Sequence, residues 1–471
     1  MQKLAKPFVV LVEKFYPDPF VFAILLSFVV FGAALGLTDA GPAQVVDAWG
    51  NGLASLMAFI GQLSFTLVGS HALAHTDAVR NALTKIGRLP KTARSAYLLV
   101  TVVTALASLL AWAFGLVVGA LIARQVAIQA KAKGLRLHYA LLVASAYSGF
   151  VVWHMGYSSS AALFVATPGH ALEELAGGVI PVSETIFASW NLITIVVTVV
   201  LLPFVMAALR PKDQAEIVEI PQSAIDDYER SMAAMDAELG VSGKILASEG
   251  GFRSTGQTET KTIAQKLESS RWINLAIGLI LIAYLSRHFI DKGLDLNLNI
   301  VNWTFLAAGL MLARSPLHYV KLIANASLTV GQIILQYPFY AGIMGMMIGT
   351  GLVSVIAGWF IAISSAATLG FWAFLSGGLI NYFIPSGGGQ WSVQGPIFFE
   401  AARELGTNPS VIVMGVAYGD QWTNMIQPFW TIPILAIAGL HMRQIMGYTF
   451  IALFATFFIF GGGILLAGAI A

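Results

Sequence analysis

Long apolar stretches separated by short polar segments make up most of the chain. The stretches without Asp, Glu, Lys or Arg are Phe20–Thr38, Ala48–Ser70, Ser95–Ala123, Leu137–Leu172, Thr185–Leu209, Leu322–Phe399, Gln421–Met442 and Gln444–Ala471. About 20 apolar residues suffice for a helix to cross the hydrocarbon core of a bilayer. The pattern therefore predicts a chain that crosses the membrane many times, with the lipid bilayer as its surroundings.

The lengths of these stretches predict an all-α membrane protein with about 10 transmembrane helices. We expect the spans near residues 19–37, 52–76, 95–125, 185–209, 272–290, 300–313, 322–349, 351–366, 411–440 and 444–470. Two further segments, near 138–170 and 369–399, contain polar or glycine-rich interruptions. We interpret each of them as a re-entrant helical hairpin, because irregular backbone inside a membrane is tolerated only where protein or a cavity surrounds it.

Composition agrees with this interpretation and excludes other classes of protein. Hydrophobic residues make up 57% of the chain and charged residues 11%, whereas soluble domains are about 25% charged. Net charge is +2, and there is no basic tract with interleaved aromatic residues, so we expect no nucleic-acid partner. The chain has no cysteine and no nucleotide-binding, serine-hydrolase or zinc-protease motif, so we expect no cofactor and no enzymatic activity.

Basic residues give an incomplete picture of orientation. Five of them lie between Arg80 and Arg94, and the positive-inside rule places this run in the cytoplasm. If 95–125 is one span, the basic residues of segment 131–136 lie outside, against the rule. If it is two shorter spans, the conflict moves to the charged segment 210–271. The sequence leaves both possibilities open.

The two halves of the chain show weak internal similarity. Residues 148–168 match 376–396 at a shift of 228, and residues 51–76 match 325–350 at a shift of 274, with five identities in each window. Segment 210–271 holds 19 of the 50 formally charged residues and connects the halves 1–209 and 272–471. Weak symmetry in a hydrophobic chain is typical of inverted-repeat transporters, which is the architecture we predict.

The interruption in the second half has the chemistry of an anion site. Pro385 stops the incoming helix, and the glycines Gly387, Gly388 and Gly389 let a ligand approach the backbone. The helix that follows starts with unpaired N–H groups, which favour a carboxylate. The side chains that could add hydrogen bonds or enclose a ligand are Asn381, Ser386, Gln390 and Trp391. The other interpretation, a plain surface turn, fits poorly because the nearest charges are Lys321 and Glu400.

The interruption in the first half offers hydroxyl groups. Ser158, Ser159 and Ser160 follow Trp153 and His154, and their side chains could bind the same ligand. Small residues also allow helices to pack closely, and we weigh the two explanations equally. His154 is a candidate proton carrier, although an intramembrane histidine is more often a packed hydrogen-bonding residue. His71 and His75 could bind a metal one helical turn apart, but no third ligand is evident, so we predict no metal site.

A third polar segment runs from Gly419 to Pro428, where the proline would break a helix. Asp420, Asn424 and Gln427 could couple transport to an ion or proton, because ionisable residues in membrane segments often mark such paths. At a shift of 236, the corresponding segment of the first half has Glu184 at the position of Asp420. Both acids could instead cap helices at the membrane interface, and for Asp420 the two explanations carry equal weight.

Two of these segments resemble a known family. Ser148–Ser160, with the sequence SGFVVWHMGYSSS, and Pro385–Trp391, with PSGGGQW, are similar to the bacterial short-chain fatty acid transporters; the resemblance covers essentially the whole chain, including Glu13–Phe20 and Gly419–Gln427. It implies uptake of acetoacetate and butyrate across the bacterial inner (plasma) membrane. It also implies membership of an ion-transporter superfamily that includes dicarboxylate carriers with paired hairpins and elevator-like motion.

One departure limits what the resemblance implies. The dicarboxylate carriers have Ser-Asn-Thr at their hairpin tips, where this chain has Ser158–Ser160 and Ser386–Gly388, so sodium coupling does not carry over directly. No basic residue lies near either tip, which favours a monocarboxylate, with Trp153, Phe383 and Trp391 around its alkyl tail. We therefore expect an ion-coupled carrier of short monocarboxylates, with Na+ or H+ as the coupling ion. A dicarboxylate carrier or a sodium/proton antiporter is the alternative, and a homodimer is the assembly that we consider.

Overall fold

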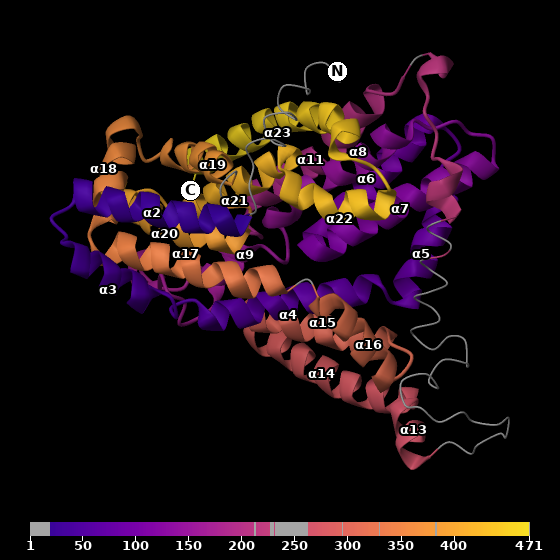
Figure 1. Ribbon diagram of the computed structural model, residues 1–471, viewed down its shortest axis with the longest axis horizontal. Coiled ribbons are helices and arrows are strands. Elements are labelled where there is room, and N and C mark those ends of the chain that lie inside the picture. Colours follow the sequence, from indigo (N-terminus) through magenta and orange to yellow (C-terminus); the bar gives the residue numbers. More distant parts are fainter. Residues whose placement is uncertain are drawn as a thin grey trace.

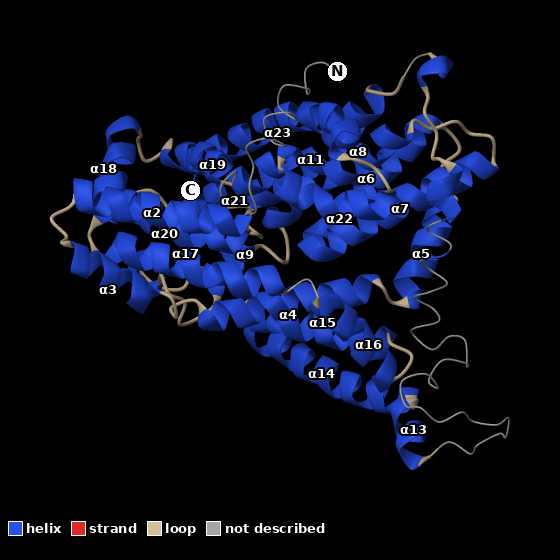
Figure 2. Ribbon diagram, in the orientation of Figure 1, coloured by secondary structure: helices blue, strands red, loops and turns tan. Residues whose placement is uncertain are grey.

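The computed structural model describes residues 19–211, 213–226, 230, 262–293, 295–328, 330–381 and 384–470. In these residues the chain consists of helices joined by short loops, and they contain no strand (Figures 1 and 2). The prediction of an all-α protein is therefore confirmed. Most of the linker 210–271 and of the segment Glu13–Phe20 lies outside the described residues.

The first half contributes helices α2 (Pro19–Leu37), α3 (Pro42–Gly52), α4 (Met57–Ala74), α5 (Asp77–Gly87), α6 (Ala93–Leu110), α7 (Trp112–Ala132), α8 (Tyr139–Gly149), η1 (Phe150–Met155), α9 (Ser160–Ala166), α10 (Glu173–Ala176) and α11 (Ser189–Ala208). The linker contains η2 (Gln214–Glu216) and α13 (Ile263–Glu268). The second half contributes α14 (Arg271–Lys292), α15 (Leu298–Leu312), α16 (Pro316–Ser327), α17 (Gly331–Gly349), α18 (Leu352–Ile363), α19 (Leu369–Ile380), α20 (Gly387–Leu405), α21 (Pro409–Thr423), η3 (Asn424–Ile426), α22 (Pro428–Ala438) and α23 (Met442–Ile470).

Six of the described helices are long and apolar enough to cross a membrane: α4, α6, α7, α11, α14 and α23. Helices α17 and α18 form a seventh candidate span if they are taken together, although they meet at a bend of 79°. Many of their outward side chains are apolar and exposed, such as Val196, Ile280 and Phe458, as expected of surfaces that face lipid rather than water.

The predicted single span 95–125 is wrong, because the chain turns back at Ala111. Helix α6 ends at Leu110 and α7 begins at Trp112, with Ala111 in an extended conformation between them. The two helices pack closely: a Cβ added to Gly115 would collide with Ser108. Neither a proline nor a charged residue marks this turn, which is why the apolar run reads as one helix.

This turn brings the basic clusters to one end of the helix bundle. The Lys133 ammonium group donates to the carbonyl oxygen of Arg88 at 2.6 Å, and Arg136 forms an ion pair with Glu219 of the linker at 2.7 Å. The basic residues before α6, those after α7 and the described start of the linker therefore lie together. The conflict with the positive-inside rule disappears.

The segment 138–170 runs away from this basic end. Its start is held there, because the N–H of Tyr139 donates to the linker carbonyl of Val218 at 2.8 Å. Its other end meets the start of α15, where the N–H of Leu298 donates to the Thr167 hydroxyl at 3.3 Å. The opposite end of α15 is followed by Arg314, which contacts Asp77 at the start of α5. These contacts favour a segment that crosses from one end of the bundle to the other with a break in its helix. The re-entrant hairpin, in which the segment would return to the end where it started, stays a prediction.

Two groups of helices can be distinguished in Figure 1. Helices α15 and α16 lie beside α4, and α14 packs on α15. The Thr66 hydroxyl of α4 donates to Asn302 of α15 at 2.6 Å. The second group contains α6–α11 and α19–α23 and carries the three interruptions after η1, α19 and α21. Helix α17 contacts α4 of the first group and α20 of the second.

Glycines bring the helices of the second group into close contact. Helices α19 and α21 approach each other through Gly370, Gly377, Gly415 and Gly419. A Cβ on Gly415 would lie 2.6 Å from the carbonyl oxygen of Gly370, closer than atoms can approach. Small residues at helix contacts are the usual way of packing helices in a membrane, where the hydrophobic effect does not drive them together.

Gly415→Ala is expected to lower the free energy of unfolding by about 1–3 kcal/mol, because the added methyl group overpacks the contact between α19 and α21. Thermal unfolding of the detergent-purified protein, followed by tryptophan fluorescence, measures the effect. The control is Gly462→Ala in α23, where no atom lies within 4 Å of an added Cβ. Equal stability of both variants and the wild type would contradict this packing.

Candidate functional site

Both predicted interruptions are present. Helix α8 continues through η1 to Met155, and α9 begins at Ser160, where the Ser159 hydroxyl caps it by accepting from the N–H of Ala162. Helix α19 ends at Ile380 and α20 begins at Gly387, capped by Ser386. The predicted ligand contact Phe383 lies outside the described residues.

The third polar segment is also interrupted. Helix α21 ends at Thr423, the short helix η3 follows, and α22 begins at Pro428, because a proline tolerates the first helical position but not the interior. Asp420 lies inside α21, whose N-cap is Asn408. Asp420 is therefore no helix cap, and its side chain is completely buried.

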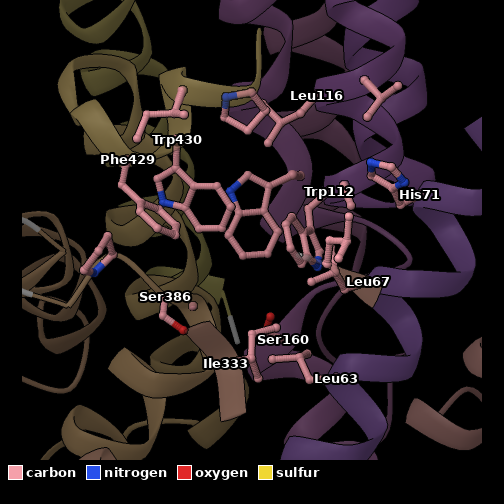
Figure 3. Close-up of a pocket in the computed structure, with 18 of the residues that line it drawn as sticks. Leu63, Leu67, His71, Trp112, Leu116, Ser160, Ile333, Ser386, Phe429 and Trp430 are labelled. Atoms are coloured by element: carbon pink, nitrogen blue, oxygen red, sulfur yellow. The ribbon is translucent and has the colours of Figure 1, made fainter. Parts of the chain in front are cut away.

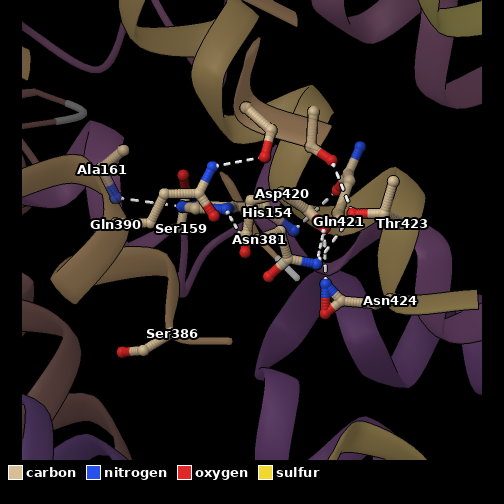
Figure 4. A network of polar contacts seen from close by, with 12 residues as sticks. His154, Ser159, Ala161, Asn381, Ser386, Gln390, Asp420, Gln421, Thr423 and Asn424 are labelled. Atoms are coloured by element: carbon tan, nitrogen blue, oxygen red, sulfur yellow. Dashed lines mark hydrogen bonds and ion pairs between the residues drawn. The ribbon is translucent and has the colours of Figure 1, made fainter. Parts of the chain in front are cut away.

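The structure brings His154 and Asp420, 266 residues apart in the sequence, into direct contact. The imidazole Nδ1 of His154 lies 2.8 Å from the Oδ2 of Asp420, and both side chains are buried (Figure 4). The backbone N–H of His154 donates to the Oε1 of Gln421 at 2.9 Å, and the N–H of Ala161 donates to the Nε2 of His154 at 3.1 Å. The pair thus links η1, α9 and α21.

Amide side chains from the second and third segments surround Asp420 (Figure 4). The Nδ2 groups of Asn381 and Asn424 both donate to the carbonyl oxygen of Asp420, at 3.0 and 2.6 Å. Gln427 donates to the carbonyl oxygen of Asn381 at 3.3 Å. The predicted substrate residue Asn381 and the predicted coupling residues Asp420, Asn424 and Gln427 therefore form one hydrogen-bonded cluster.

Four oxygen atoms of this region are buried without a hydrogen-bond donor among the described residues. They are the Oδ1 atoms of Asn381, Asp420 and Asn424 and the Oε1 of Gln390. Buried polar atoms without partners are rare in proteins and call for an explanation, such as a ligand, an ion or a proton. The Nε2 of Gln390 is satisfied, since it donates to the carbonyl oxygen of Gly377 at 2.7 Å.

The glycine triplet fits tightly against other parts of the site. A Cβ on Gly387 would lie 2.7 Å from the Cε1 of His154 and 3.2 Å from the Oδ2 of Asp420. Added carbons on Gly388 and Gly389 would collide with Phe59 and Tyr340. The start of α20 can approach the histidine–aspartate pair only because these positions carry no side chain.

A cavity of about 620 Å³ lies between the two groups of helices (Figure 3). Ser160 from the first interruption and Ser386 and Gly387 from the second both line it. Most of its wall is apolar or aromatic, formed by Leu63, Leu67, Trp112, Leu116, Trp153, Ile333, Tyr337, Phe429 and Trp430. Among the described residues, no Asp, Glu, Lys or Arg lines this cavity.

Other predicted ligand residues lie behind the cavity wall. The Ser158 hydroxyl accepts from the N–H of Trp112 at 2.9 Å, and Ser159 caps α9, so these serines hold the backbone together. Gln390 is buried in the amide region, and Trp391 packs edge-to-face on Phe399 with ring centroids 5.2 Å apart. Of the first-half serines, Ser160 is the one that lines the cavity.

His71 and His75 also line the cavity, and Figure 3 shows His71 on the side of Leu116 and Trp112. The two histidine rings stack with centroids 4.5 Å apart, and the Nδ1 of His75 lies 3.0 Å from the carbonyl oxygen of His71. Within the described residues, no group of three or more His, Cys, Asp or Glu side chains could hold a metal ion. Glu184, the proposed counterpart of Asp420, is exposed.

Sequence reasoning missed Trp112, Tyr337, Gln421 and Trp430. The Tyr337 hydroxyl lies 2.6 Å from the Oγ of Ser386, and the Trp430 ring contacts that of Trp112 with centroids 5.4 Å apart. Trp430 could have been found, because it follows the predicted break at Pro428. Trp112 follows a turn that no residue type signals.

Comparison with solved structures supports the fold. The chain is similar to the YdaH transporter of Alcanivorax borkumensis, with a TM-score of 0.56 and 16% identity, covering 96% of this chain and 98% of that one. It is equally similar to MtrF of Neisseria gonorrhoeae, described as one of a class of antimetabolite efflux pumps, with a TM-score of 0.57 and 16% identity over 96% and 97% of the two chains. At this identity the likeness concerns the fold.

Sequence relatives are much closer. A protein of Escherichia coli K12, provisionally named a short-chain fatty acid transporter, is 38% identical over 455 residues, which is 97% of each chain. A Haemophilus influenzae protein with the same name is 37% identical over 451 residues, covering 94% of this chain and 95% of that one. The family model for short chain fatty acid transporters matches residues 1–467. The chain is therefore a multi-pass membrane protein that belongs to the short-chain fatty acid transporter family.

Proposed function

We propose that this protein is a secondary active transporter that takes up short monocarboxylates, such as acetoacetate and butyrate, across the bacterial inner membrane by ion-coupled alternating access. The observation that carries the proposal is the cavity into which both interrupted helices open, with the buried His154–Asp420 pair directly behind Gly387. Ion-coupled transport of a small anion needs a binding site for one negative charge and a second site that binds the coupling ion.

The start of α20 is the place we propose for the substrate carboxylate. The first N–H groups of a helix lack partners within the helix, and its dipole favours negative charge there. Gly387 and the Ser386 hydroxyl line the cavity at this point, and Ser160 lies on the same cavity. Trp112, Trp153 and Trp430 give the remainder an apolar wall, which suits a short alkyl tail.

A monocarboxylate fits this cavity better than a dicarboxylate. The described lining contains no lysine or arginine, so a second carboxylate would lose its hydration without gaining a counter-charge, which is strongly unfavourable. The dicarboxylate carrier and the sodium/proton antiporter stay as alternatives on the same scaffold. The buried pair and the amide cluster make Asp420, His154, Asn424 and Gln427 candidates for coupling, with Na+ or H+ as the ion.

We extend the proposal to the finer topology and to the motion. The apolar stretch Ala23–Leu37 of α2 and the helices α15 and α19 are shorter than a full span, and with the interrupted helices they support about 10 crossings. The cavity takes its lining from α4 of the first group, from α7, α9, α20 and α22 of the second, and from α17, which contacts both. A relative movement of these two groups would alternately expose the site, which supports an elevator-type mechanism.

Uptake of labelled butyrate and acetoacetate into proteoliposomes tests this function. The full chain should accumulate either acid when a pH or sodium gradient is imposed, after subtraction of passive diffusion into protein-free liposomes. The absence of uptake under either gradient would overturn the proposal. Proton flux without any organic anion would favour the antiporter instead.

Competition among straight-chain acids should reveal the apolar wall. From acetate through propionate to butyrate, each added methylene should strengthen competition about fourfold, because burying one contributes about 0.8 kcal/mol. The measurement is inhibition of labelled butyrate uptake at constant pH. Stronger competition by succinate than by butyrate would point to the dicarboxylate alternative.

Gly387→Ala should reduce the initial rate of butyrate uptake about tenfold or more. The new methyl group would meet His154 and Asp420 and displace the start of α20 from them. Rates are compared per mole of monodisperse reconstituted protein. Gly358→Ala in α18 is the matched control, since no atom lies within 4 Å of its added Cβ, and it should transport like the wild type. Normal uptake by the Gly387 variant would contradict the proposed site.

A further inference from the structure

We infer that the coupling ion is a proton, that Asp420 carries it, and that His154 is a positioning residue which stays neutral. This inference rests on the proposed transport function and concerns the ion site behind the cavity. It separates two neighbouring groups that the sequence offers as candidates for ion or proton coupling.

The hydrogen bonds of His154 determine where its ring proton sits. A backbone N–H can only donate, so the Nε2 that faces the N–H of Ala161 at 3.1 Å must be an acceptor without a hydrogen. The ring hydrogen is then on Nδ1 and points at the Oδ2 of Asp420, 2.8 Å away. In this arrangement the imidazole is neutral and Asp420 is the acceptor (Figure 4).

Protonating His154 would disrupt the first interruption. A hydrogen on Nε2 would oppose the N–H of Ala161, which lies in the first turn of α9, next to the cavity residue Ser160. The Gln421 side chain also holds the histidine backbone from α21. The ring is therefore held at both of its nitrogens in the neutral form, and the backbone of the same residue is held as well.

Asp420 has an open position for the proton. Its Oδ1 is buried and has no hydrogen-bond partner among the described residues, so a proton can add there without breaking any bond of the pair. Within the described residues, His154 is its one ion-pair partner. Protonation would remove a buried negative charge, which is otherwise costly.

Other titratable groups near the pair are tyrosines with partners of their own. Tyr337 of α17 hydrogen-bonds the Ser386 hydroxyl, Tyr147 of α8 donates to the carbonyl oxygen of Asn424, and Tyr418 of α21 donates to Asn191. None of these contacts supplies a cation to Asp420. The carboxyl group is thus the member of the cluster that can exchange a proton without releasing a contact.

The position of Gly387 couples this proton to the substrate. Gly387 lines the cavity, and a carbon added to it would lie 3.2 Å from the Oδ2 of Asp420. A substrate carboxylate at the start of α20 and an ionised Asp420 would repel each other in a medium of low dielectric constant. Substrate binding would therefore favour the protonated aspartic acid, and one proton would travel with each carboxylate.

The test compares exchange with accumulation in proteoliposomes that contain the full chain. Exchange of labelled for unlabelled butyrate at equal pH on both sides needs no net proton movement, whereas accumulation driven by a pH gradient does. Protein-free liposomes correct for passive diffusion. In Asp420→Asn, the ratio of accumulation to exchange should fall at least about tenfold, and exchange should lose its dependence on pH, since the site no longer titrates.

His154→Gln separates the two roles of the pair. Glutamine can donate to Asp420 and accept from Ala161 but cannot titrate, so this variant should keep proton-driven accumulation, with a shifted pH midpoint. Glu184→Gln, an exposed acid, is the control and should match the wild type. Loss of proton coupling in His154→Gln together with its retention in Asp420→Asn would overturn the inference, and so would accumulation that only a sodium gradient drives.

A spectroscopic measurement keeps the inference testable if Asp420→Asn does not fold. Butyrate added to the wild type or to His154→Gln should produce the infrared band of a protonated buried carboxyl group, and its absence from both would overturn the inference. A wild type that exchanges butyrate without proton coupling would also overturn the inference but leave the proposed function intact. A wild type without any exchange would overturn the proposed function itself.

Discussion

The contact between His154 and Asp420 is the interaction on which the site depends. It joins η1 in the first half to α21 in the second, inside a region that excludes water. Removing one member of such a buried pair leaves the other uncompensated, which typically costs about 3–5 kcal/mol. The contact thus holds η1 against α21, and the absence of a side chain at Gly387 lets the start of α20 approach the pair.

The sequence predicts those features that one residue type imposes locally. Prolines also occur inside α11, α17, α20 and α22, but Pro385 beside the glycine triplet and Pro428 after a run of polar residues indicate breaks, so the interruptions after α19 and α21 could be located in advance. The turn at Ala111 could not, because it depends on the packing of α6 against α7, and alanine is compatible with a continuous helix. The partnership of His154 with Asp420 could not either, since nothing local relates the two positions.

The cavity shows the same division between local and tertiary information. Of the residues that the sequence proposes for the ligand, Ser160, Ser386, Gly387 and Trp153 line the cavity, whereas Asn381, Gln390 and Trp391 lie behind it. Along α20, successive residues point in different directions, so a run of polar residues after a helix start cannot all face one ligand. The internal repeat also stays a prediction. Helix α6 contacts α7, α8 and α11, much as α19 contacts α20, α21 and α23, which would make α6 the counterpart of α19. The sequence shift of 228 instead aligns α8 with α19.

Unsatisfied oxygens are the property that links this architecture to transport. Helix interruptions inside lipid are tolerated when other groups satisfy the exposed backbone, and here Asn381, Asn424 and Gln427 donate their amide hydrogens to carbonyl oxygens. Those donations leave the Oδ1 atoms of Asn381 and Asn424 and the open oxygen of Asp420 without donors. A site of low dielectric constant with surplus acceptors attracts a positive charge, and the proton that we propose to travel with the substrate would satisfy that need while leaving the packed core unchanged.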